Sequence, residues 1–90
     1  MIIYKTEFKK KNGELRQMKF VRPSTEHPGE AFINANIKGT RKVTLGEEFE
    51  RVWDLEAKGF RTINHKELTQ PIEPVGYAVY IETTNTFVYD

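Results

Sequence analysis

ERVWDLEAKGFRTINHKEL, residues 50–68, contains the only tryptophan of a 90-residue chain and a dense run of alternating side chains. Four of its side chains are large enough to anchor the core of a small domain: Trp53, Leu55, Phe60 and Ile63. Lys58 and Gly59 separate the two apolar groups and are residues that can close a turn. The rest of the chain is interpreted relative to this stretch.

Two structures compete between residues 44 and 59. Capping-box spacing begins at Thr44, and Phe49, Val52 and Trp53 share one helical face, which favours a helix. Glu56 would then interrupt the apolar face. In the alternative, a strand runs to Leu55 and residues 60–64 return as its antiparallel partner.

The N-terminal part predicts a β-hairpin. Residues 2–9 and 15–21 are strand-like runs, and Asn12-Gly13 between them indicates a type I′ turn, in which both central residues need positive φ. We expect Tyr4 and Phe8 to face the core. The return strand contributes either Leu15 or, on the opposite parity, Met18 and Phe20.

The remaining segments are shorter. Residues 22–30 carry two prolines and a glycine and predict a loop, whereas residues 31–37 suit either a helical turn or an edge strand. Residues 41–45 are strand-like. Pro71 and Pro74 bracket a predicted connector to a second hairpin, residues 75–89.

These elements predict one mainly β domain, residues 1–90, with residues 71–90 as a C-terminal hairpin extension. Five or six strands and at most one short helix favour a small antiparallel barrel or a strongly bent sheet. The chain has no cysteine, no secretory pattern and no apolar run of membrane-spanning length. We therefore expect a soluble, cytoplasmic protein without a membrane partner.

No catalytic pattern is evident. His27 and His65 lack metal-ligand spacing, and Ser24, the only serine, is not in a nucleophile motif. The six glycines are isolated, so no phosphate-binding loop is predicted. The sequence therefore predicts neither an enzyme nor a cofactor or metal site.

Two blocks of sequence carry a family resemblance. Residues 52–56 (VWDLE) and 59–62 (GFRT), with a closing Leu68, follow residues 8–13 (FKKKNG) and three further matching residues, Arg16, Met18 and Lys19. Together they resemble small bacteriophage proteins of unknown function with an SH3-like β-barrel, similar to the barrel of WYL domains. Residues 22–44 and those from Pro71 onward do not match. The Trp-Tyr-Leu triplet of WYL domains is absent, so no ligand residues are carried over.

The resemblance implies an SH3-like fold, a phage source, a regulatory role in the bacterial host cytoplasm, and strands rather than a helix around Trp53. It identifies no ligand.

Charge is unevenly distributed along the chain. Residues 1–42 hold ten Lys or Arg against four Glu, a net charge of +6, and residues 43–90 hold four against nine acidic residues, a net charge of −5. The basic half suggests contact with nucleic-acid phosphates. The candidate residues are Lys9, Lys10, Lys11, Arg16, Lys19, Arg22, Arg41 and Lys42. The alternative explanation is that these lysines only keep an exposed hairpin tip soluble and protect its strand edges.

The alternative is a module that binds a host or phage protein. Its contacts would be the acidic stretch or the terminal hairpin, through Glu47, Glu48, Glu50 and Tyr80. A solvated acidic face is the ordinary explanation of such a stretch. Arg61 is expected to bridge to Asp54 across its hairpin, and Trp53 to serve as a core side chain.

Overall fold

A computed structural model describes residues 1–23, 29–36 and 46–89. In chain order its elements are β1 (Ile2–Lys9), β2 (Leu15–Val21), α1 (Gly29–Asn36), β3 (Phe49–Asp54), β4 (Gly59–Asn64), the 3-10 helix η1 (His65–Glu67), β5 (Leu68–Tyr77), β6 (Val79–Ile81) and β7 (Thr86–Val88). The prediction of a mainly β protein is confirmed for these residues, which form seven strands rather than the predicted five or six, and the short helix that the prediction allowed is α1. The strand predicted at residues 41–45 lies outside them.

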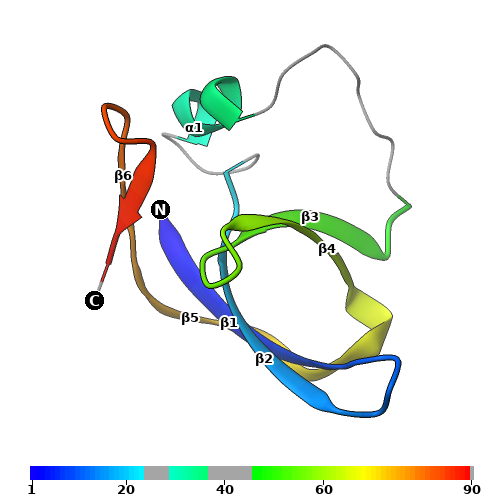
Figure 1. Cartoon of the computed structure of the whole chain (residues 1–90). Helices are drawn as coiled ribbons and strands as arrows, with labels where there is room; N and C mark the ends of the chain where they lie inside the picture. Colours follow the sequence, from blue (N-terminus) through cyan, green and yellow to red (C-terminus); the bar gives the residue numbers. More distant parts are fainter. Residues whose placement is uncertain (24–28, 37–45, 90) are drawn as a thin grey trace.

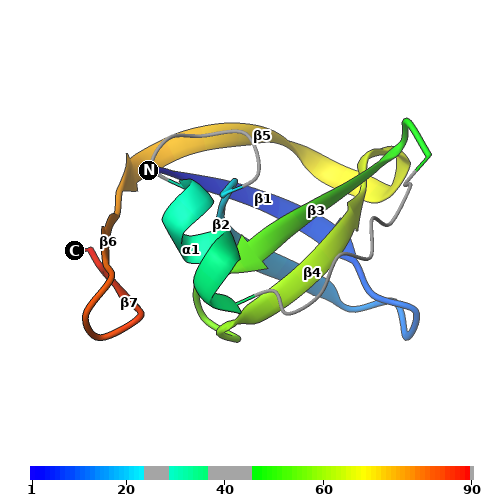
Figure 2. The ribbon, with the colours of Figure 1, turned by 90° about the horizontal axis from the view of Figure 1, so that it is seen from above.

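The main sheet is antiparallel, with strand order β4-β3-β2-β1-β5, and β6 pairs with β7 in a separate two-stranded sheet. The main sheet is strongly bent, so that β3 and β4 lie across an interior from β1 and β5 (Figure 1). Viewed from above, α1 and the β6–β7 hairpin lie at one end of the curl and the β1–β2 turn lies toward the other (Figure 2). This bend is what creates an enclosed concave face.

The first hairpin has the predicted strands, with Tyr4 opposite Phe20 and Lys9 opposite Leu15. Its turn differs from the prediction. Only Gly13 has positive φ, at 88°, and its amide donates to the carbonyl of Lys10 (2.9 Å). The loop is therefore a three-residue connection with the glycine in the left-handed position, rather than a type I′ turn.

The central hairpin resolves the ambiguity in favour of strands. β3 pairs with β4 from Phe49 opposite Asn64 to Asp54 opposite Gly59, and Lys58, at φ 53°, closes the connection. Strand parity places Val52 on the concave face and leaves Glu56 exposed in the turn. A helix would have put Glu56 among apolar side chains, so the helical alternative is wrong here.

The predicted connector at Pro71 and Pro74 is wrong, because both prolines lie inside the ten-residue strand β5. β5 pairs with β1, from Phe8 opposite Leu68 to Ile2 opposite Tyr77, with three register shifts along the way. It is an edge strand of the main sheet, and an edge position tolerates residues without an amide hydrogen.

Two apolar clusters hold the molecule together. The concave face contributes Met18, Phe20, Val52 and Ile63, flanked by Tyr4, Phe8, Leu68 and Ile72. The other cluster contains Met1, Ile3, Val21, Leu55 and Ala78, flanked by Trp53 and Phe87. Tyr4, Phe8, Met18 and Phe20 therefore face inward as predicted, whereas the alternative, Leu15, is 60% exposed.

α1 packs on the sheet and on the terminal hairpin through Phe32, and its Asn36 side chain also exchanges two hydrogen bonds with Asn85 of the terminal hairpin (2.9 and 3.0 Å). Phe32 is 1% exposed, and its ring lies edge-on to Trp53 at 4.7 Å and to Tyr80 at 5.3 Å between centroids. Phe60 and Phe87 also contact it. Trp53 is thus a structural residue, as predicted, in an aromatic cluster that links α1, the β3–β4 hairpin and the β6–β7 hairpin.

Candidate nucleic-acid interface

A pocket of about 640 Å³ opens between the β1–β2 turn and the end of β4. Its lining residues are Phe8, Lys9, Lys10, Lys11, Arg16, Met18, Phe49, Arg61, Thr62, Ile63, Asn64, Glu67 and Leu68. They come from all five strands of the main sheet, from the β1–β2 turn and from η1, so the bend of the sheet is what brings them together.

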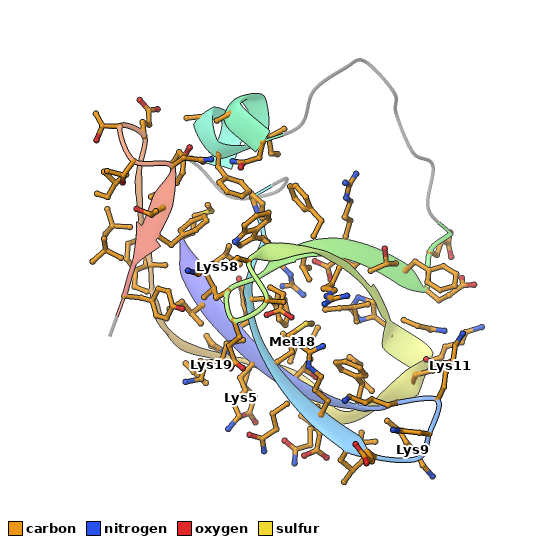
Figure 3. The ribbon with its side chains drawn as sticks, viewed as in Figure 1. Lys5, Lys9, Lys11, Met18, Lys19 and Lys58 are labelled. Atoms are coloured by element: carbon orange, nitrogen blue, oxygen red, sulfur yellow. The ribbon has the colours of Figure 1, made fainter. Side chains whose placement is uncertain are left out.

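Strand periodicity explains the apolar part of the pocket. Phe8, Met18 and Ile63 sit at inward positions of β1, β2 and β4, and Leu68 follows η1 at the start of β5. Met18 points into the interior of the curl (Figure 3). The four side chains continue the core to the pocket, so its inner surface is apolar.

The rest of the lining is strongly cationic. Its charged residues are Lys9, Lys10, Lys11, Arg16 and Arg61, against the single carboxylate of Glu67. Among the described residues, no carboxylate lies within ion-pairing distance of the three lysines. Lys9 and Lys11 lie at the hairpin tip in Figure 3, whereas Lys5 and Lys19 lie on the outer face of the sheet.

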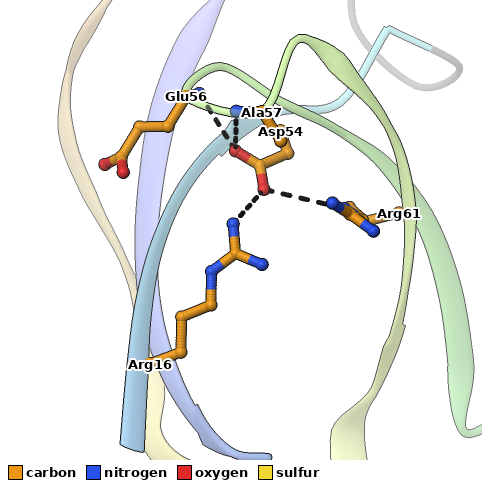
Figure 4. Close-up of polar contacts among 5 residues, drawn as sticks. All are labelled: Arg16, Asp54, Glu56, Ala57 and Arg61. Atoms are coloured by element: carbon orange, nitrogen blue, oxygen red, sulfur yellow. Dashed lines mark hydrogen bonds and ion pairs between the residues drawn. The ribbon is translucent and has the colours of Figure 1, made fainter.

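Asp54 forms ion pairs with both arginines of the pocket. It is fully buried, and its Oδ2 accepts a hydrogen bond from Arg16 Nη2 at 2.8 Å and lies 3.9 Å from Arg61 Nε (Figure 4). Its Oδ1 accepts from the amides of Glu56 (3.0 Å) and Ala57 (3.1 Å). One carboxylate therefore shapes the β3–β4 turn and also orients two guanidinium groups on the pocket wall.

The predicted bridge between Arg61 and Asp54 is confirmed, although the side chain of Arg61 remains 53% exposed. Arg16 is less exposed, at 29%, and its guanidinium carbon lies 6.0 Å from the centroid of the Phe8 ring. Both arginines thus present cationic surface to the pocket while paired with Asp54. The sequence favours the bridge to Asp54 over a ligand contact for Arg61, and the structure is compatible with both roles.

The eight predicted nucleic-acid contacts divide into three groups. Lys9, Lys10, Lys11 and Arg16 line the pocket together. Lys19 lies opposite Lys5 on the outer face, and Arg22 is bound to Glu50, with Nη2 3.1 Å from Oε1 and Nε 2.6 Å from Oε2. Arg41 and Lys42 lie outside the described residues.

The alternative partner-binding residues do not form one surface. Glu50 is held by Arg22 and by His65, whose Nε2 lies 3.0 Å from Oε1. Tyr80 donates its hydroxyl hydrogen to Asn85 and packs on Phe87. Glu47 and Glu48 lie just before β3. The terminal hairpin does expose apolar side chains, and Val79 and Val88 lie opposite each other on it.

The sequence analysis did not select Phe49, Thr62, Asn64 or Glu67 as site residues. The positions of Phe49, Thr62 and Asn64 depend on whether residues 49–54 form a strand paired with β4 or a helix, which the sequence left open. Glu67 lies in η1, which the sequence analysis did not predict. Once the β3–β4 pairing is known, Phe49 opposite Asn64 places both at the end of the hairpin that borders the pocket.

In the described part of the chain, no group of three metal-ligating side chains is close enough to hold an ion. None of the helices in that part has the length and apolar character needed to cross a membrane. Comparison of the chain with protein-family models, curated proteins and solved structures found no match. The site is therefore interpreted from its own chemistry.

Proposed function

We propose that the chain is a non-enzymatic regulatory protein, phage-encoded as its sequence resemblance implies, that binds nucleic acid at the cationic pocket. The observation that supports this is the convergence of Lys9, Lys10 and Lys11 with Arg16 and Arg61 around one opening. Phosphate groups are bound by such clusters of ammonium and guanidinium groups.

The outer face of the sheet differs from the pocket in its charge pattern. Lys5 lies opposite Lys19 on one side and opposite Glu73 on the other, so cations and a carboxylate are interleaved there. At the pocket five cations accompany the carboxylate of Glu67 and the buried carboxylate of Asp54 behind Arg16 and Arg61, which leaves a cationic excess. An extended anion gains more from the pocket than from a mixed surface, because like charges reinforce one another within a Debye length.

The test is fluorescence anisotropy with labelled single-stranded and duplex DNA and RNA. If three to five phosphates are neutralised, a rise of the salt concentration from about 50 to about 200 mM should lower the affinity about 20- to 130-fold for a single strand and about 40- to 500-fold for a duplex. The triple variant Lys9→Glu, Lys10→Glu, Lys11→Glu should abolish binding at the lower salt concentration.

The matched control replaces Lys5, Lys19 and Lys58 by Glu. Each substitution changes the charge by −2, so both triple variants have a formal net charge of −5 instead of +1. We expect the control to retain most of the affinity. Equal loss in both variants would show that net charge rather than the pocket governs binding, and absence of binding at low salt would refute the proposal.

A further inference from the structure

We propose that the pocket receives an unpaired nucleobase, so that the ligand is single-stranded nucleic acid. This inference rests on the proposed function and specifies the class of ligand. The cationic side chains contact the phosphates, and the apolar inner surface contacts the base.

The aromatic residues of the pocket are the first argument. All six phenylalanines are described, and Phe49, at 39%, is the most exposed of them. It borders the pocket on β3, and Phe8 borders it on β1. Exposed aromatic rings beside a cationic groove are the usual stacking surfaces for unpaired bases.

The apolar inner surface is the second argument. A site that contacted only a phosphate backbone would need charged side chains but no apolar inner surface. Here Met18, Ile63 and Leu68 line a volume that lies within the range of small-molecule sites, about 300 to 1,000 Å³. A base, which is planar and has apolar faces, can enter this volume while its phosphates remain at the cationic rim.

Polar groups at the pocket provide hydrogen-bonding capacity for a base edge. The Oδ1 atom of Asn64 accepts the amide hydrogen of Lys66 at 3.0 Å, so the amide nitrogen of this side chain is the group that can donate to a ligand. Thr62, an exposed residue, also borders the pocket. Donors of this kind match the carbonyl oxygens of a pyrimidine such as thymine.

A duplex cannot use this pocket without unpairing a base, which costs a few kcal/mol. We therefore expect the protein to bind a single strand of twelve thymidines at least about 10-fold more tightly than a duplex of equal length. The decisive probe is a twelve-unit deoxyribose-phosphate strand without bases, which has the same phosphates and nothing to insert.

Binding of these three probes is measured by anisotropy at one salt concentration, for the wild type and for Phe49→Ala, Phe49→Leu and Phe49→Tyr. Loss of base stacking at Phe49 should weaken thymidine binding by about 10-fold in the Ala and Leu variants, and the Tyr variant should restore it. None of the three should alter binding of the abasic strand. Leu15→Ala, an exposed apolar residue outside the pocket, is the control.

Equal binding of the thymidine and abasic strands, or an unchanged affinity in Phe49→Ala, would overturn base insertion and leave the proposed nucleic-acid function intact. Failure of every probe to bind at low salt would overturn the proposed function itself. Salt-sensitive binding that prefers the duplex would also contradict the inference.

Discussion

Asp54 shows how one residue connects the fold to the candidate site. It is a fully buried carboxylate in a turn, and its two oxygen atoms serve different partners. The Oδ1 atom fixes the β3–β4 connection through two backbone amides. The Oδ2 atom fixes Arg16 and Arg61. Removing the side chain therefore disturbs both the hairpin and the cationic wall.

We predict that two substitutions of Asp54 lower the stability of the protein by different amounts. Asp54→Ala removes every acceptor and leaves Arg16 and two amides without this partner, and should lower the free energy of unfolding by about 2 to 4 kcal/mol. Asp54→Asn retains an oxygen for the turn amides and should cost about half as much. Urea denaturation measures both. Equal losses would show that the turn hydrogen bonds contribute nothing to stability.

Gly13 illustrates what local sequence can and cannot predict at this scale. The Asn12-Gly13 pair correctly located the first turn, because few residue pairs tolerate such a connection. The turn type depends on which hydrogen bonds form within the turn, and these could not be predicted from the residue pair alone. The side chain of Asn12 accepts the amide of Glu14 at 3.1 Å, and only the glycine adopts positive φ.

At the scale of elements, Phe32 is the side chain on which the docking of α1 depends. Phe32→Ala should cost about 3 to 5 kcal/mol, because it removes a fully buried ring from contact with four other aromatic rings. The helix has only eight residues, too few to be stable alone. We therefore expect α1 to lose its hydrogen-exchange protection while the main sheet retains its own.

The control on the same helix is Ala35→Gln, because Ala35 is exposed and its replacement should leave stability unchanged. A shift of Trp53 fluorescence in Phe32→Ala, absent from the control, would report the opened aromatic cluster. Retained protection of α1 in Phe32→Ala would contradict this account of its docking.

The β1–β2 hairpin could be predicted from local patterns. The β3–β4 hairpin was favoured over a helix only by the family resemblance, and β5 could not be predicted. Pro71 and Pro74 lack amide hydrogens and would disrupt a central strand. They are compatible with an edge strand, and whether a strand lies at the edge is decided by the arrangement of the whole sheet. The sequence therefore indicated a break where the chain forms its longest described strand.

At the scale of the whole molecule, the two oppositely charged halves of the chain interleave in part. Arg16 pairs with Asp54 and Arg22 with Glu50, which neutralises charge between the halves. The lysines of the first turn are left at the pocket, where they are joined by Arg61 from the acidic half. The charge distribution of the sequence pointed to the lysines as site residues. Only the fold shows that Arg61 lies beside them at the pocket and that Lys19 lies away from them on the outer face.

The most direct test of the site is a titration of the ¹⁵N-labelled protein with a strand of twelve thymidines, followed by amide chemical shifts. Binding at the pocket predicts the largest, saturable changes at Lys9 to Arg16, at Phe49 and at Arg61 to Leu68, with little change in α1 and in the β6–β7 hairpin. Changes centred on α1 and the terminal hairpin, with the first turn unaffected, would contradict the assignment of the pocket as the nucleic-acid site.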